Sequence, residues 1–404
     1  MRYLRWLRTA AVAGSACVLG LGVLPMSAAH AEVQPLAPSS VRAPESDQFS
    51  AEGVTTVGEL RTIGALSNAA ASRTQIISHP GATYIKVHIS ALRLAAGDYV
   101  TVSSPDGRES YRYDRDLNRD TGADYTTDGL PGFWAMSVEG DTAVVTVHGK
   151  SANAVTVDRF WRGYDQAEIT RYNISLMSVC STDARRDVVC YQNSHPTEYA
   201  RGRAVARLLI SGGGLCTTWR VGNTNRMLTN KHCFSTQAAV SGSEMQFNYQ
   251  CATCGGGNPG AGTKVSGATL YRVSSGGSNQ LDYTLYSVNN FASIQSFGTL
   301  YLATSATTTG TRIYIPGHGD GSPKRLSIFE NAQNGPTCAV RNANYNTWNI
   351  SYSCDTSGGN SGSPVLNSAH RVVALHHLGG CPSNQGAKAH LIYNEIASLI
   401  DNNG

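Results

Sequence analysis

Short stretches in which apolar and polar residues alternate, each ended by a turn, recur along most of this chain. Thr83–Ile89 reads Thr-Tyr-Ile-Lys-Val-His-Ile, and Val155–Phe160 repeats the alternation. A period of two places every second side chain on the same face of a sheet, whereas a helix requires a period of 3.6. The 42 Gly residues supply turn positions between such short strands. The pattern therefore predicts an all-β fold.

The strands form two groups on either side of a polar junction at residues 162–182. In residues 55–165, regular Pro, Asp and Gly turns between period-two strands predict a β-sandwich. Residues 166–404 are again β-rich, and only Asn394–Asp401 has the apolar spacing of a short C-terminal helix. With 404 residues, the chain is long enough for two domains, each with its own core.

The N-terminus has the layout of an export signal. Three basic residues come first, namely Arg2, Arg5 and Arg8. The apolar stretch Thr9–Leu24 follows, and then the small-residue site Ala29–Ala31. This order predicts a signal peptide over residues 1–31 and a secreted protein that has no membrane contact once the signal is removed. The Pro-, Ser- and Ala-rich residues 32–54 are predicted to be a flexible leader.

Charge is divided unequally between the two halves. Residues 32–171 hold 13 Lys/Arg against 18 Asp/Glu, a net −5, whereas residues 172–404 hold 16 against 10, a net +6. These opposite charges favour docking of one half on the other, with an attraction that salt would screen. No basic block is interleaved with aromatic residues, so nucleic acid is not an expected partner.

Three segments of the second half carry residues suited to nucleophilic catalysis: Met227–Cys233, Gln280–Leu285 and Cys354–Pro364. A serine hydroxyl such as that of Ser361 is a weak nucleophile and needs an adjacent base. The imidazole of His232 could take the hydroxyl proton and later deliver it to a leaving amine. The carboxylate of Asp282 could hold that imidazole in the required tautomer. We therefore predict a catalytic triad of His232, Asp282 and Ser361.

The backbone around Ser361 is also suited to stabilise an oxyanion. Gly358 and Gly359 permit the unusual dihedral angles that turn amide groups inward. The N–H groups of Gly359 and Ser361 are therefore predicted to form an oxyanion hole.

Chain order separates two classes of hydrolase. His, then Asp, then Ser is the order of the chymotrypsin-like double β-barrel, whereas an α/β-hydrolase runs Ser, Asp, His and uses Gly-x-Ser-x-Gly. Residue 363 is Ser, so that elbow pattern is broken here. The chain also lacks the alternating helices of an α/β-hydrolase. We therefore predict a β-sandwich followed by a chymotrypsin-like double β-barrel.

The three segments resemble those of secreted bacterial serine endopeptidases of the chymotrypsin fold. The Gly-Asn-Ser-Gly-Ser-Pro run at 359–364 is similar to the glutamyl endopeptidases. Asn248–Gln250 ahead of Cys251, and Leu375–Gly380 ahead of Cys381, resemble the lysyl endopeptidases. The resemblance covers about residues 175–404, and the sandwich more loosely resembles the pro-regions of such enzymes.

The resemblance implies an active serine endopeptidase acting on proteins or peptides, without a cofactor and as a monomer. Asp282 is carried by the weakest motif, and Asp320 and Asp355 compete with it for the triad role. The alternative is an inactive relative of the fold that acts as a binding or adhesion module through its sandwich.

Cysteines of an exported protein are candidates for disulfides. Cys17 would leave with the signal, and the nine that remain all lie in the second half. The resemblance implies the pairs Cys216–Cys233, Cys180–Cys381 and Cys190–Cys254. Cys338–Cys354 is then the remaining pair, and Cys251 is the odd thiol. Cys251 and Cys254 form a C-x-x-C without a second copy, so we expect disulfide pairing of its cysteines, here Cys254 with Cys190, rather than a metal site.

Residues expected near the first specificity pocket leave two substrate classes open. Asp355 lies six residues before Ser361, at the offset where trypsin-like enzymes place the acid that binds Lys or Arg. Thr356 and His377, with Gly379 beside them, match positions that bind an acidic side chain in glutamyl endopeptidases. We expect a preference for Glu, with Lys or Arg second.

Asn360 stands where chymotrypsin has an aspartate that pairs with the new N-terminal amine after activation. Because an amide offers no full charge, we expect this activation switch to be absent. Residues 32 to about 174 are predicted to be an intramolecular pro-region or an attached accessory domain.

Overall fold

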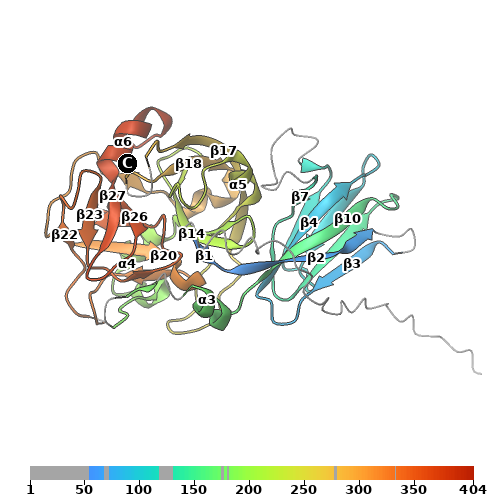
Figure 1. Ribbon diagram of the computed structural model, residues 1–404, viewed down its shortest axis with the longest axis horizontal. Helices are drawn as coiled ribbons and strands as arrows, with labels where there is room; N and C mark the ends of the chain where they lie inside the picture. Colours follow the sequence, from blue (N-terminus) through green and yellow to red (C-terminus); the bar gives the residue numbers. More distant parts are fainter. Residues whose placement is uncertain are drawn as a thin grey trace, which may run out of the picture. The chain divides into compact units, whose positions relative to one another are not determined.

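A computed structural model describes residues 54–67, 72–117, 131–173, 177–179, 182–276, 280–332 and 334–404. The chain is β-rich throughout this part (Figure 1). A β-sandwich is followed by a double β-barrel with a short C-terminal helix, which confirms the predicted fold class. The predicted signal peptide and nearly all of the predicted leader lie outside the described residues. No helix in the described part is long and apolar enough to cross a membrane.

Two sheets that share one apolar core make up the β-sandwich. The first contains β2 (Gly58–Ser67), β10 (Val155–Gly163), β4 (Tyr84–Leu92), β7 (Phe133–Trp134) and β8 (Val138–Glu139). The second contains β3 (Thr74–Ser78), β9 (Thr142–His148), β5 (Tyr99–Ser103) and β6 (Ser110–Tyr113). Alternate residues of β9, such as Ala143, Val145 and Val147, are buried, as the period of two predicts.

The first barrel is a closed sheet of six strands. Its strands are β13 (Val205–Ile210), β14 (Gly214–Arg220), β15 (Met227–Thr229), β16 (Glu244–Phe247), β17 (Thr263–Val273) and β18 (Thr284–Val288). Pairing of β14 with β15 closes it. A short strand ahead of the sandwich, β1 (Thr55–Thr56), adds to the same sheet along β14. The first barrel therefore includes a strand from the N-terminal half.

The second barrel is an open sheet that shares a core with the first. Its strands are β12 (Arg186–Asp187), β19 (Tyr301–Leu302), β20 (Ile313–Gly317), β21 (Arg325–Ser327), β22 (Val340–Asn342), β23 (Asn349–Tyr352), β25 (Pro364–Asn367), β26 (Arg371–Leu378) and β27 (Asn384–Lys388). Trp219 and Leu285 of the first barrel belong to the same buried cluster as Tyr314 and Leu375 of the second. Loops from both barrels meet where the predicted site residues lie.

The C-terminal helix α6 spans Ala389–Ile396 and continues as a 3₁₀ turn through Leu399. It begins five residues earlier than the predicted Asn394, because Ile392 is buried together with Ile396. Within the described ranges, three helices were not predicted, namely α3 (Gln166–Tyr172), α4 (Pro196–Gly202) and α5 (Gln237–Gly242). Each is too short to repeat an apolar period, so only capping signals could have located it.

Buried ion pairs connect the sandwich to the first barrel. Glu244 of β16 pairs with Lys86 of β4, and its carboxylate also accepts hydrogen bonds from the N–H and hydroxyl of Ser137, each at 2.8 Å. Lys264 of β17 pairs with Glu109 and Glu139, each at 2.9 Å. The Lys264 pairs join a cation of the barrel to acids of the sandwich, as the net charges of the two halves favour. In the Lys86–Glu244 pair the cation belongs to the sandwich and the acid to the barrel.

Candidate active site

His232 and Asp282 are brought together by two neighbouring strands of the first barrel. His232 follows β15, and Asp282 precedes β18. These strands pair antiparallel with Thr229 opposite Thr284, so both residues lie at the same end of the ladder. Asn230 reinforces this geometry, because its side-chain N–H donates to the Asp282 carbonyl at 2.9 Å.

Asp282 holds His232 at two points. Its Oδ2 lies 2.7 Å from His232 Nδ1, and its Oδ1 accepts the His232 backbone N–H at 3.0 Å. Burial alone would raise the pKa of Asp282, but contacts with His232 and His377 outweigh it and lower the pKa to about 2. Because the ionised Asp282 carboxylate bonds both the ring and the backbone N–H of His232, it fixes the orientation of the imidazole.

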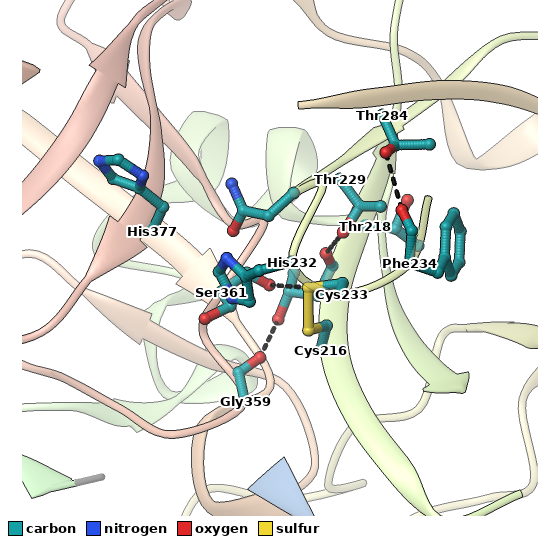
Figure 2. The surroundings of a disulfide bond; sticks show 12 residues. Cys216, Thr218, Thr229, His232, Cys233, Phe234, Thr284, Gly359, Ser361 and His377 are labelled. Atoms are coloured by element: carbon teal, nitrogen blue, oxygen red, sulfur yellow. Dashed lines mark hydrogen bonds between the residues drawn. A yellow bond between two sulfur atoms is a disulfide. The ribbon is translucent and has the colours of Figure 1, made fainter. Parts of the chain in front are cut away.

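Ser361 lies in the loop between β24 (Thr356–Ser357) and β25, next to the first barrel. Thr217 of β14 donates its N–H to the Ser361 carbonyl at 2.8 Å. Sγ of Cys233, the residue after His232, lies 3.9 Å from the same carbonyl oxygen. Figure 2 shows His232 and Ser361 beside the Cys216–Cys233 disulfide. The disulfide therefore ties the His232 turn to the strand that binds the Ser361 loop.

The structure records no hydrogen bond between the Ser361 hydroxyl and the His232 ring. Such bonds are often long in a protease without substrate and tighten in the complex. The two residues nevertheless share a framework, since both are anchored on β14 and the Cys216–Cys233 bridge.

Gly359, which is predicted to belong to an oxyanion hole, has a left-handed backbone conformation that favours glycine. Its φ is +96°, and a Cβ there would stand 2.6 Å from Leu215 Cδ2 and 2.8 Å from the His318 carbonyl oxygen. Its carbonyl is turned into the protein, where it accepts from Thr217 Oγ1 at 2.8 Å. Neither the Gly359 nor the Ser361 N–H donates to any group in the described part of the chain. Both donors are therefore unoccupied.

The two competing aspartates lie away from His232. Asp320 Oδ2 accepts from Arg185 at 2.9 Å, and Asp355 Oδ2 accepts the Ala184 N–H at 2.9 Å. Both carboxylates are thus engaged with the segment that leads into the second half, and only Asp282 contacts His232.

Of the predicted pocket residues, His377 occupies an unexpected place. It is buried, with Nδ1 3.2 Å from Asp282 Oδ2 and Nε2 3.0 Å from Asn349 Oδ1. Both ring nitrogens are therefore engaged inside the protein. Thr356 is buried in β24, which pairs with β11 (Met177–Ser178), and Gly379 follows the end of β26. A contact between His377 and Asp282 has no local signal in the sequence, because 95 residues separate the two.

Three of the four expected disulfides are present: Cys190–Cys254, Cys216–Cys233 and Cys338–Cys354. Cys381 is disulfide-bonded, and its expected partner Cys180 lies outside the described residues. Cys251 is free and buried, as expected for the odd thiol. Cys216, Cys233 and His232 cluster closely enough to bind a metal, but the disulfide leaves no thiolate among them.

Comparison with known proteins agrees with this geometry. Residues 216–375 match the trypsin-like peptidase domain family. The match begins at the cysteine that bridges to Cys233 and includes His232, Asp282 and Ser361. Residues 216–375 are therefore similar to trypsin-like peptidase domains, and they lie within the double β-barrel described above.

Among curated proteins, the chain is similar to "Secreted RxLR effector protein 73" of Plasmopara viticola, with 34% identity over 233 residues. The match covers 55% of this chain and 56% of that protein, so the chain spans little more than half the length of this relative. Solved structures similar to it include a Glu endopeptidase in complex with MPD (22% identity, TM-score 0.42), covering 55% of this chain and 99% of that one. Another is the active form of the Rv3671c protease from M. tuberculosis (12% identity, TM-score 0.38), covering 55% and 90%.

Proposed function

We propose that the protein is a secreted serine endopeptidase with Ser361 as nucleophile, His232 as general base and Asp282 as the carboxylate that orients His232. The observation that carries this proposal is the pair of hydrogen bonds between Asp282 and His232. Asp282 Oδ2 lies 2.7 Å from His232 Nδ1, and Asp282 Oδ1 accepts the His232 backbone N–H at 3.0 Å. That arrangement leaves Nε2 of His232 as the ring nitrogen available for proton transfer. An orienting carboxylate of this kind is a recurring element of serine hydrolases.

In the first half-reaction, Ser361 Oγ attacks the substrate carbonyl carbon while His232 Nε2 takes the hydroxyl proton. The C–N bond then breaks, the amine leaves with the proton from His232, and the acyl group stays on Ser361 as an ester. Water repeats the sequence with His232 as base, which releases the acid and restores the serine. Asp282 stays ionised throughout, and its negative charge stabilises the imidazolium that forms twice.

The N–H groups of Gly359 and Ser361 would bind the oxyanion of both tetrahedral intermediates. Their lack of any other acceptor supports this role, since donors already in use would have to break a bond first. A preorganised donor of this kind contributes about 3–4 kcal/mol to transition-state stabilisation in other enzymes.

For the residue before the scissile bond, we propose a preference for Glu, with Lys or Arg second. A preference for a basic side chain would need the Asp355 carboxylate in the pocket, but that group is buried and accepts the Ala184 N–H. His377 is engaged on both ring nitrogens, so the support for Glu is the similarity of the run at 359–364 to the glutamyl endopeptidases rather than a free histidine. Hydrolysis rates for peptides that differ only at this residue would test the preference.

Secretion is supported by the export-type N-terminus and by the disulfides, which persist in oxidising compartments. The name of the similar Plasmopara viticola protein also describes a secreted protein. The sandwich would act as an intramolecular pro-region or accessory domain, and its buried ion pairs with Glu244 and Lys264 support a stable attachment.

The decisive experiment compares the secreted protein with its Ser361→Ala variant. We expect the wild type to hydrolyse peptides and to be labelled by a fluorophosphonate, and the variant to do neither. Activity that survives the substitution would show that Ser361 is not the nucleophile. A folded wild type with neither activity would overturn the proposal and favour a binding role for the sandwich.

A further inference from the structure

Arg185 is a buried cation at the base of the loop that carries Ser361. Its side chain is only 3% exposed. A guanidinium has five N–H donors in a planar fork and is always charged. Here Nε and Nη2 donate to the two carboxylate oxygens of Asp183, at 2.9 and 2.8 Å. Nη2 also donates to Asp320 Oδ2 at 2.9 Å, and Nη1 donates to Ser357 Oγ.

The partners of Arg185 lead directly to the predicted oxyanion hole. Ser357 is the last residue of β24, four residues before Ser361. Asp320, which Arg185 holds through its carboxylate, donates its own N–H to the Gly358 carbonyl at 2.7 Å. The guanidinium therefore restrains two consecutive residues, Ser357 and Gly358, immediately before Gly359.

Asn360 adds an electrostatic reason for a cation at this place. Its Oδ1 is buried and accepts no hydrogen bond from the part of the chain that the structure describes. A Cβ at Gly319 would stand 2.1 Å from this oxygen, 2.4 Å from Ser357 Oγ and 2.7 Å from Arg185 Nη1. The side-chain oxygen of Asn360, which carries a partial negative charge, therefore lies close to the Arg185 guanidinium. Gly319 lies between these two groups, and a larger residue would not fit there.

We propose that Arg185 is a positioning residue that holds the 357–361 loop in the conformation in which the Gly359 and Ser361 N–H groups can bind the oxyanion. This inference rests on the proposed serine protease function. It also accounts for the neutral Asn360: the chain carries its own cation beneath the loop, so no new N-terminal amine is required there. Arg185 touches neither substrate nor Ser361, and it acts through Ser357, Asp320 and Gly358.

The test measures kcat and KM for peptide hydrolysis by the secreted full-length protein and three variants. Arg185→Met should lower kcat about 100-fold and leave KM within about threefold, since the oxyanion donors act in the transition state. Arg185→Lys, which keeps the charge but not the fork, should fall between Met and wild type. Arg325→Gln is the matched control, because Arg325 lies 3.6 Å from the same Asp183 and its side chain makes no hydrogen bond or ion pair with residues 357–361 in the described structure.

Chemical rescue separates positioning from general stability. Asp183, Arg185 and Asp320 line a pocket of about 380 Å³, through which a small cation could enter. Millimolar guanidinium should raise kcat of Arg185→Ala at least tenfold and leave Arg325→Gln unchanged.

The inference is overturned if Arg185→Met keeps kcat within about threefold of wild type, or if Arg325→Gln loses as much. If Arg185→Met does not fold, the Arg185→Lys variant takes its place in the test. The inference is then also overturned if Arg185→Lys has the kcat of the wild type and guanidinium does not restore kcat in Arg185→Ala. An active wild type with an inactive Ser361→Ala separates these outcomes from failure of the proposed function. Failure of that function would overturn the inference as well.

Discussion

Nδ1 of His377 lies 3.2 Å from Oδ2 of Asp282. The same oxygen lies 2.7 Å from His232, so a single buried carboxylate oxygen serves two imidazole rings. Nε2 of His377 lies 3.0 Å from Asn349 Oδ1. His377 thus links Asp282 to the second barrel through β23 and β26. His377 therefore supports the Asp282 carboxylate at the same oxygen that contacts His232.

His377→Leu should lower kcat/KM for every substrate by about the same factor, roughly 10- to 100-fold. The substitution removes one hydrogen bond to a charged group, which contributes about 1.5–3 kcal/mol. The measurement is kcat/KM for matched peptides with Glu, Lys or Ala before the scissile bond. If His377 bound the substrate side chain instead, the Glu-to-Ala ratio would collapse while hydrolysis of the Ala peptide stayed near its wild-type rate.

Asp282→Asn should destabilise the protein in a pH-dependent way. The pKa of Asp282 falls from its usual 3.8 to about 2 in the folded chain, because its contacts with His232 and His377 outweigh burial. A depressed carboxyl pKa contributes stability that is complete above pH 3.8 and is lost as pH falls through about 2, amounting to about 2 kcal/mol. Urea unfolding should therefore show a gap between wild type and variant at pH 7 that narrows towards pH 3. A gap independent of pH would contradict the role of the charge.

Much of the site could be predicted from the sequence, because the chemistry sits in short local motifs. His232-Cys233 and the run around Ser361 are contiguous, and their order along the chain distinguishes a double barrel from an α/β-hydrolase. Contacts that arise only from folding could not be found in this way. His377 contacts Asp282 across 95 residues, and Arg185 lies just after the polar junction at residues 162–182, in a stretch without a recognisable motif.

Dependence on contacts that form only on folding also explains why some helices and strands were not predicted. Alternating burial along β9 could be predicted from its sequence, because the period of two of a strand is visible within a few consecutive residues. Helices of six or seven residues such as α4 and α5 complete fewer than two turns, and tertiary packing rather than periodicity determines them. β1 is only two residues long, and its pairing with β14 depends on a partner about 160 residues away.

Lys324→Met should stabilise the protein, most strongly at neutral and acidic pH. Lys324 is fully buried, and its Nζ has no hydrogen-bond partner among the described residues. Burial lowers its pKa from 10.5 to about 7, and the Arg203 charge adds to the effect. Between pH 10.5 and 7 the unfolded chain binds a proton that the folded chain does not, so stability falls as pH decreases through this window. Methionine removes that penalty. Thermal unfolding midpoints should rise at pH 6 and converge with wild type near pH 10, and a lower midpoint at pH 6 would contradict the prediction.

β1 lies along a stretch of β14 that adjoins the Ser361 loop. Thr55 and Thr56 pair with Leu215 and Gly214, and the Val57 N–H donates to the Gly213 carbonyl at 2.8 Å. Antiparallel ladders alternate, so Thr55 and Leu215 form the next hydrogen-bonded pair. The Leu215 side chain closely approaches Gly359. An extended peptide can bind a sheet edge as an added strand, and β1 already occupies this edge.

Thr55→Pro should therefore raise the activity of the full-length protein on peptides that extend past the scissile bond. Proline removes the N–H that donates to Leu215, and one hydrogen bond of about 1 kcal/mol corresponds to a gain of about fivefold in access to the edge. Thr55→Val is the matched control, because it keeps the backbone N–H, and the Thr55 hydroxyl makes no hydrogen bond within the described part of the chain. The measurement is kcat/KM for a peptide with three residues after the scissile bond and for one that ends at the leaving group. A gain confined to the longer peptide supports blocking by β1, whereas equal or reduced activity on both peptides would mean that β1 is only a structural strand.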